Sequence, residues 1–136
     1  MKLDSSAFQA DPELLAALDA RCAPMTCVQE KLLFRQGDAP TGLYILRRGQ
    51  ATLTMTSVTG DLLLDTPVNA GALLGLPGVI GNQPYSLTAV VAAGSELGFI
   101  SVKDFSELML KEPALALSVL RVLAAEVRTA RTAITS

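Results

Sequence analysis

The sequence predicts a mainly β domain, a small antiparallel barrel or jelly roll, with flanking helices. Two patterns support this fold class. Seven short apolar runs follow one another between residues 25 and 100, and glycine-containing turns separate most of them. Helical periodicity occurs only before and after this region. A chain of 136 residues, 50% of them apolar, can bury one core without disulfides or metals, so we expect a single domain.

The first element is a short helix over residues 12–20. Asp11 is a typical N-cap and Pro12 suits the first helical position. The apolar face of this helix consists of Leu14, Leu15 and Leu18. From residue 25 the period changes, and we predict strands at residues 25–29, 31–35, 43–47, 51–56, 62–65, 86–91 and 96–100. Strands this short, at this spacing, are typical of a small barrel or jelly roll.

Two helices follow the last predicted strand. Ser101 and Asp104 resemble a capping box that begins the first helix, and Pro113 ends it and starts the second. The second helix spans residues 114–134 and carries apolar residues at steps of four and three, the spacing of a heptad seam. The seam residues are Ala116, Leu120, Leu123, Val127, Ala130 and Ile134.

A second apolar stripe, formed by Leu115, Val119 and Val122, lies beside the seam. A helix that is buried along one stripe needs one partner, whereas this helix offers two stripes. We therefore expect the seam to pair with a second copy of the chain in a homodimer. The alternative is that one wide face packs entirely on the barrel of its own chain. The chain is thus divided into an N-terminal helical segment (1–24), a β-roll (25–100) and C-terminal helices (101–136).

Charge and hydropathy exclude several kinds of partner. The formal charge of −2 gives no general attraction to nucleic acid, so we expect no nucleic-acid binding by this domain alone. Residues 66–95 contain no charged residue, but prolines and glycines throughout the stretch would leave a lipid-exposed backbone unbonded. The N-terminal residues lack the apolar core of a signal peptide. We predict a cytoplasmic protein without membrane contact.

Histidine is absent, which removes the usual general base near neutral pH and the commonest zinc and haem ligand. The carboxylates are scattered, and the sequence has no nucleophile elbow and no P-loop. We therefore predict that the chain is not an enzyme and has no catalytic residues, no metal site and no cofactor. Cys22 and Cys27 could form a redox pair or half of a metal site, but two weakly polar residues in a loop or strand are the commoner interpretation.

Residues 31–54, KLLFRQGDAPTGLYILRRGQATLT, resemble the signature of cyclic-nucleotide-binding domains. In that family a strand ends in a Gly-Asp turn, here at Gly37, and an apolar strand leads to a tight turn at glycine, here Gly49. Three further segments resemble the approach to the phosphate-binding cassette (70–76), the strand after it (86–92) and the final strand with the next helix (96–109). The resemblance is closest to the sensor half of Crp/Fnr-type bacterial transcription regulators. It implies a double-stranded β-helix (jelly roll) of the cyclic-nucleotide-binding type, a long C-terminal helix and a ligand-sensing role.

The resemblance also implies where a ligand would bind. The cassette positions are Leu74, Gly75, Leu76, Pro77, Gly78, Ser86, Leu87 and Thr88. Members that bind cyclic nucleotides carry a glutamate for the ribose after the cassette glycine, and an arginine for the phosphate further along. Here Leu76 occupies the glutamate position, and Leu87, or Ser86 if the alignment slips by one residue, occupies the arginine position. We therefore predict a degenerate cassette that does not bind cAMP or cGMP.

The sequence leaves open what, if anything, binds in place of a cyclic nucleotide. The apolar cassette residues suit a small apolar ligand, or else the pocket has collapsed and these residues are core. Haem would lack its usual axial histidine. Two other classes remain as alternatives: a ligand-free dimerisation or protein-interaction domain, and an enzyme on a cupin-like barrel, which normally needs histidine ligands. Crp/Fnr-type regulators continue into a DNA-binding domain after the long helix, so we expect either a solitary sensor or part of a longer regulator.

Overall fold

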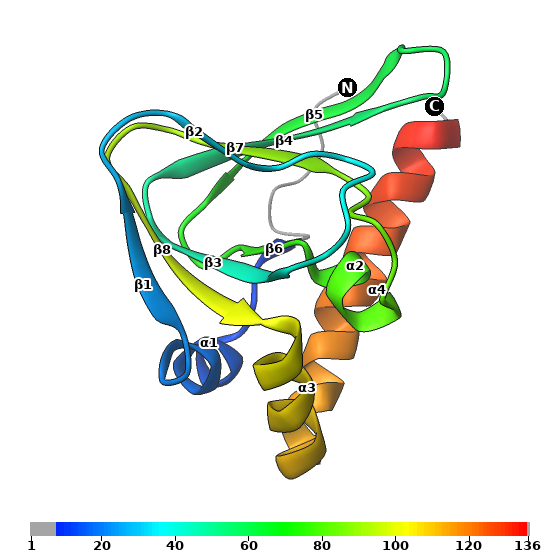
Figure 1. Ribbon diagram of the computed structural model, residues 1–136. Helices are drawn as coiled ribbons and strands as arrows, with labels where there is room; N and C mark the ends of the chain where they lie inside the picture. Colours follow the sequence, from blue (N-terminus) through cyan, green and yellow to red (C-terminus); the bar gives the residue numbers. More distant parts are fainter. Residues whose placement is uncertain (1–7, 136) are drawn as a thin grey trace.

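The computed structural model describes residues 8–135. In this part of the chain two four-stranded antiparallel sheets form a roll, and helices pack below it and along one side (Figure 1). The strand orders are β1-β8-β3-β6 and β2-β7-β4-β5. The strands are β1 (Ala23–Cys27), β2 (Lys31–Phe34), β3 (Gly42–Arg48), β4 (Gln50–Thr56), β5 (Leu62–Asn69), β6 (Leu73–Leu74), β7 (Thr88–Val91) and β8 (Ser95–Ser101). The helices are α1 (Pro12–Asp19), α2 (Leu76–Gly81), α3 (Val102–Lys111) and α4 (Pro113–Thr135). The predicted jelly roll with flanking helices is confirmed.

Alternating side chains fill the interior of the roll. In β4, Ala51, Leu53 and Met55 are buried, and the residues between them are exposed or half-buried. β5 pairs antiparallel with β4 and buries Leu64 and Val68 against the same interior. This period of two is what the pleat of a strand with one covered face requires.

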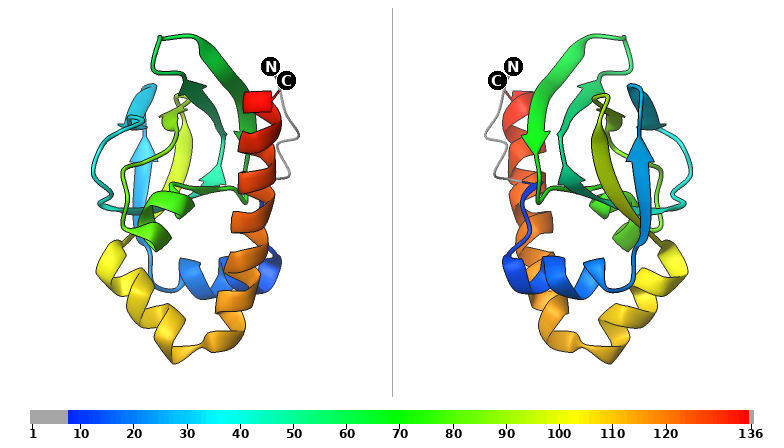
Figure 2. Two further views of the ribbon diagram at one scale, coloured as in Figure 1. Left: turned by 90° about the vertical axis from the view of Figure 1, so that its right-hand side faces the viewer. Right: turned by 90° about the vertical axis from the view of Figure 1, so that its left-hand side faces the viewer.

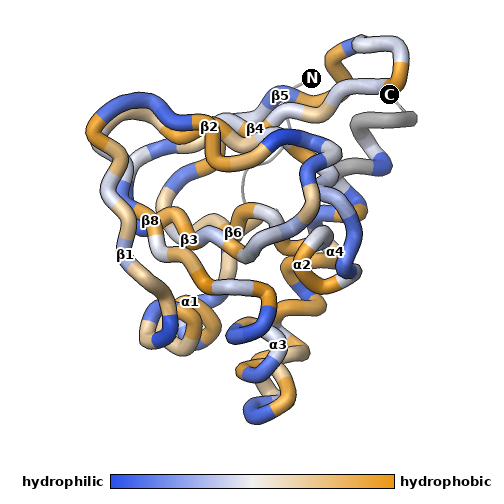
Figure 3. The backbone as a smooth tube through the Cα atoms, in the orientation of Figure 1, coloured by the Kyte–Doolittle hydropathy of each residue, from blue (hydrophilic) through white to orange (hydrophobic). Residues whose placement is uncertain are grey.

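Strand β3 is covered on both faces. Leu46 packs in the roll interior, whereas Leu43 and Ile45 pack in a second core cluster with the helices. This double burial explains the unbroken apolar run at residues 43–46, since neither face of the strand meets water. Figure 3 shows apolar residues concentrated along β3, β6 and the helices, with hydrophilic residues at many of the turns. The helices contribute Leu14, Leu18, Phe105, Leu108, Leu115, Val119 and Val122 to the second cluster.

Helices α1 and α3 begin at the N-cap residues that the sequence predicts. The Asp11 side chain accepts a hydrogen bond from the Leu14 N–H at 2.8 Å, and the Ser101 hydroxyl accepts one from the Asp104 N–H at 3.1 Å. Two strands differ from the predicted ranges: β1 has the predicted length but lies two residues earlier, and β5 continues to Asn69 instead of ending at residue 65. The sequence does not predict β6, because a two-residue strand is too short to show a period.

The turn between β3 and β4 can be made only by glycine. Gly49 has φ +97°, and a Cβ at this position would overlap the Ser95 hydroxyl oxygen. The glycine of the family signature therefore shapes the roll.

Helix α4 is the longest element and runs along the whole side of the roll (Figure 2). The second predicted stripe, Leu115, Val119 and Val122, is buried against its own chain. The opposite side of the helix stays exposed, and it carries Leu117, Leu120 and Val127. The two predicted stripes thus have different environments within one chain.

Candidate functional site

The cassette begins where β6 ends. Gly75 adopts a left-handed conformation with φ +97° and turns the chain into the six-residue helix α2. A Cβ at this glycine would lie 2.8 Å from the Cε1 atom of Tyr85, closer than real Cβ contacts allow. The cassette glycine is therefore required both by backbone conformation and by the ring packed against it.

Tyr85 holds the far end of the cassette in place. Its hydroxyl donates a hydrogen bond to the Gly42 carbonyl at 2.7 Å, and it accepts hydrogen bonds from the N–H groups of Thr41 (3.1 Å) and Gly42 (3.2 Å). Its ring stacks on Phe34 with a centroid separation of 3.9 Å. These contacts tie the loop after α2 to the start of β3, so the cassette is a fixed wall of the site.

The space under the cassette is nearly filled. Its free volume is about 10 Å³, at the lower limit for one water molecule. We call it the cassette space. The residues around it include Phe34, Leu53, Leu73, Leu74, Gly75, Pro77, Gly78, Ser86 and Leu87. A ligand as large as a nucleotide would need these side chains to move.

A second and larger space lies between the cassette, the roll and α4. It has a volume of about 230 Å³, and we call it the α4 cavity. Its apolar walls come from three parts of the fold: Met55 and Leu64 of the roll, Pro77 and Leu87 of the cassette, and Val127 of α4. Phe8, Ser86, Glu126, Thr129 and Arg131 complete its lining.

Glu126 lines both the cassette space and the α4 cavity. Its buried carboxyl group is unexpected among the apolar side chains that surround it. Its side chain is only 6% exposed, and its Oε2 atom is buried without a hydrogen-bond partner among the residues that the structure describes. Burial raises the pKa of Glu126 well above its ordinary value, because the surroundings solvate the carboxylate poorly. A buried polar group in this condition is costly to the fold, so its presence requires an explanation.

Most of the predicted cassette residues come together. Leu74, Gly75, Pro77, Gly78, Ser86 and Leu87 all line the cassette space. Leu76 differs from the expectation: it is fully buried in the second core cluster and is not among the described residues that line either space. The reason is that α2 starts at Leu76 and packs against β3, which places this side chain in the second core cluster. Thr88 is also outside the site, and its hydroxyl accepts the Gln36 N–H at 2.9 Å.

The predicted seam residues of α4 are only partly described. Leu120 is 55% exposed and Val127 45% exposed, while Ala116 and Leu123 are half-buried. Leu123 also packs against the second core cluster. The side chains of Ala130 and Ile134 lie outside the described residues. Val127 lies on the exposed face of α4 and also lines the α4 cavity.

Glu126 is the functional candidate that the sequence analysis does not identify, although a signal for it exists. The buried stripe of α4 runs through Leu115, Val119 and Val122 at steps of four and three. The next step of four leads to Glu126, an acid at a position where the pattern requires an apolar residue. A single polar exception in a buried stripe marks a site of interest.

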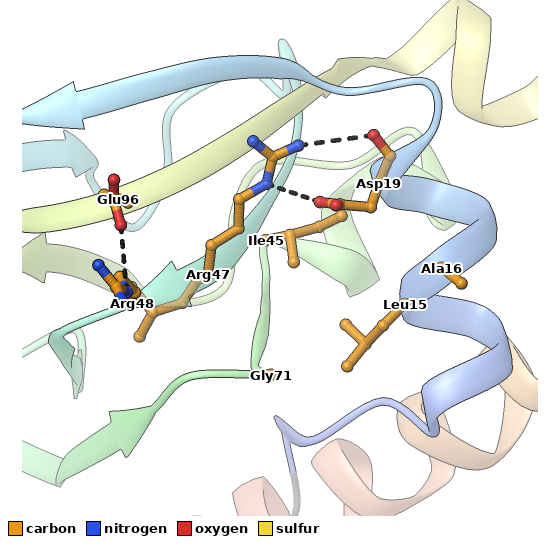
Figure 4. A pocket seen from close by; sticks show the side chains of 9 residues that line it. Leu15, Ala16, Asp19, Ile45, Arg47, Arg48, Gly71 and Glu96 are labelled. Carbon is orange, nitrogen blue, oxygen red and sulfur yellow. Dashed lines mark hydrogen bonds and ion pairs between the residues drawn. The ribbon is translucent and has the colours of Figure 1, made fainter.

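A larger open groove lies elsewhere, between α1 and β3 (Figure 4). It has a volume of about 440 Å³. Its charged groups already pair with each other: the Arg47 Nε atom lies 2.6 Å from the Asp19 carboxylate, and Arg48 lies 3.5 Å from Glu96. We therefore place the candidate site in the α4 cavity, where a buried polar group lacks a partner among residues 8–135.

No three His, Cys, Asp or Glu side chains gather as potential metal ligands within the described part of the chain. Cys27 is buried in the roll interior, and Cys22 packs against the second cluster, both as free thiols. Burial raises the pKa of Cys22 to about 11, so this thiol stays protonated near neutral pH. Among the described helices, none has the length and hydropathy needed to cross a membrane.

Comparison with known proteins agrees with the fold. The sequence model of the cyclic nucleotide-binding domain matches residues 25–112. The fold is similar to the catabolite activator protein of Thermus thermophilus, with 22% identity and a TM-score of 0.77 over 97% of this chain. It is also similar to the sensor domain of the transcriptional regulator DNR from Pseudomonas aeruginosa, with 22% identity and a TM-score of 0.65, covering 88% of this chain and 80% of that one.

The chain spans 62% of the length of the Thermus protein, which is less than two thirds. A cyclic nucleotide-binding-like protein from Brucella abortus is 30% identical, with a TM-score of 0.55, over 73% of this chain and 84% of that one. A search of curated proteins finds no match. Since the domain model covers more than half of the sequence and the structure has the corresponding roll, the chain belongs to the cyclic nucleotide-binding domain family.

Proposed function

We propose that this chain is a regulatory ligand-sensing domain of the Crp/Fnr type whose degenerate cassette does not bind cAMP or cGMP. The observation that carries this proposal is the cassette space itself. It is nearly filled, and none of the described residues around it carries a positive charge. The cyclic phosphate of a nucleotide would thus find neither room nor a cation where the family supplies an arginine.

The remaining anchors for an anion are weak. Helix α2 has six residues, and its N-cap Gly75 provides no side-chain hydrogen bond. Leu87 lies where the phosphate partner would be expected and offers only methyl groups. A charge-assisted hydrogen bond to phosphate contributes about 1.5–3 kcal/mol, which backbone N–H groups present in every member of the family do not replace.

We expect cAMP and cGMP to bind with dissociation constants no lower than about 1 mM. Removing one partner of a buried charged group costs about 2–5 kcal/mol, which takes a micromolar site into the millimolar range. Isothermal titration calorimetry measures this, with a family member that retains the glutamate and the arginine as the positive control. Micromolar binding of either nucleotide by this chain would contradict the proposal.

The homodimer is the second part of the proposal. Leu117, Leu120 and Val127 expose apolar surface on α4, opposite the stripe that the helix buries in its own chain. Burying a large apolar side chain contributes about 1.5–3 kcal/mol, so two copies of this face together would offset much of the cost of association. We therefore infer that α4 pairs with α4 of a second copy.

Replacing Leu120 with glutamate should convert the dimer to monomers, because two charges would then meet in an apolar interface. Leu120 suits this test better than Leu123, which also packs in its own core. Sedimentation velocity at tens of micromolar protein measures the change. The matched control is Val58→Glu, an apolar residue that is fully exposed in the loop between β4 and β5 and should leave the dimer intact. A monomeric unmodified protein would disprove the pairing.

A ligand-free dimerisation domain is the second candidate function, and the filled cassette space favours it. It does not account for the α4 cavity, nor for the buried carboxyl group that faces it. The ligand-sensing function accounts for both, so it is the function that we put first.

A further inference from the structure

The α4 cavity combines apolar walls with one deeply buried hydrogen-bonding group. Phe8, Met55, Leu64 and Leu87 supply apolar surface from four separate segments of the chain. Glu126 projects from α4 into this surface and lacks a partner for Oε2 among the described residues. Pockets for small molecules have this composition: mostly apolar lining with few polar groups that set the orientation of the ligand.

The position of Glu126 is difficult to explain as packing alone. It continues the stripe of Leu115, Val119 and Val122, where a leucine would bury the same volume without a polar penalty. A ligand that hydrogen-bonds to the carboxyl group would remove that penalty. The free volume beside the group, about 230 Å³, provides the room.

The surroundings of Glu126 also select the charge of the ligand. Arg131 is the other charged residue among those that line the cavity, and its side chain is exposed. Among the residues that the structure describes, no buried cation lines the cavity to balance an anionic group next to Glu126. Burial raises the pKa of Glu126, so these apolar surroundings favour the protonated form of the group. A protonated carboxyl group offers one donor and one acceptor, which complement a neutral amide.

We propose that the α4 cavity binds a small uncharged molecule with an apolar body and an amide-type group, and that Glu126 hydrogen-bonds to that group. The cavity is smaller than the about 300–1,000 Å³ of pockets for drug-sized ligands, so the molecule has few heavy atoms. This inference rests on the proposed ligand-sensing function and adds the chemical class of the ligand.

Hexanamide is a suitable probe, because it joins a short apolar chain to a primary amide. We expect millimolar concentrations of it to shift the amide NMR signals of residues around the α4 cavity. Hexylammonium and hexanoate have nearly the same length and shape but carry a charge, and we expect both to bind at least tenfold more weakly. Tighter binding of hexylammonium would overturn the inference, since it would show that Glu126 pairs with a cation.

Two variants of the buried acid test its role. Glu126→Gln keeps a donor and an acceptor and should retain hexanamide affinity within about threefold, whereas Glu126→Leu removes both and should weaken binding about tenfold. Glu30→Gln is the matched control, because Glu30 is exposed between β1 and β2 and should leave the affinity unchanged. Equal affinity of the wild type and the Glu126→Leu variant would overturn the role of Glu126. Thermal unfolding of each variant shows whether it is folded.

The outcomes separate this inference from the function on which it rests. If neither hexanamide nor the cyclic nucleotides bind, the ligand class is wrong while the degenerate cassette stands. If cAMP or cGMP binds at micromolar concentration, the proposed function itself is wrong. Hexanamide binding that disappears as the pH rises and Glu126 ionises would support the neutral-ligand assignment, and binding that strengthens with pH would overturn it.

Discussion

Replacing Leu76 with glutamate is expected to unfold the domain or to lower its free energy of unfolding by about 4 kcal/mol or more. The resemblance to family members that bind cyclic nucleotides predicts a glutamate at this position, yet here the leucine side chain is fully buried in the second core cluster. Truncating a buried leucine alone costs about 2–5 kcal/mol, and a carboxylate among apolar side chains adds a desolvation penalty. Since domains are stable by only about 5–15 kcal/mol, a loss of this size removes much of the total.

Urea denaturation monitored by circular dichroism measures the loss. The matched control is Ile80→Glu, because Ile80 lies on the same short helix but is 41% exposed, so its replacement should change stability by less than about 0.5 kcal/mol. Leu76→Met should cost less than about 1.5 kcal/mol, since it conserves volume and polarity. An L76E variant as stable as the wild type would show that this side chain faces the ligand space after all.

Replacing Glu126 with leucine is expected to stabilise the domain by about 1–3 kcal/mol near neutral pH. The substitution removes a buried carboxyl group that lacks a hydrogen-bond partner among the described residues, and it continues the apolar stripe of α4. Exposed acids do not carry this penalty, so Glu107→Leu on α3 is the matched control and should change stability little. Unchanged or lower stability of the E126L variant would show that the carboxyl group is satisfied in solution.

The same residue predicts a pH dependence of the wild type. Burial raises the pKa of Glu126 in the folded state above its value of about 4.3 in the unfolded chain. The contribution of the protonated group is therefore complete below about pH 4.3 and is lost as the pH rises toward the folded pKa. Across that window the wild type should lose stability relative to Glu126→Gln, at a slope of at most about 1.4 kcal/mol per pH unit. Parallel pH profiles of the two proteins would contradict this.

Local sequence patterns predict most of the elements, because their causes are local. Asp11 and Ser101 cap their helices through side-chain hydrogen bonds that span three residues. Pro113 lacks an N–H and so separates α3 from α4. The alternation in β4 follows from the pleat of the strand itself. Where such a cause is weak, as in the two-residue strand β6, prediction from the sequence fails.

The features of the candidate site also fall into two groups, those that the sequence predicts and those that only the tertiary structure decides. The sequence by itself determined that the cassette segment supplies no cation of its own, because residues 66–102 contain no lysine or arginine. Only the tertiary structure decided that Leu76 turns into the core, that Leu87 faces the cassette space, and that Glu126 is buried beside an open cavity. These features depend on how α2 and α4 pack against strands far away in the chain. The period of a helix shows which residues share a face, but the packing of the whole fold decides what each face meets.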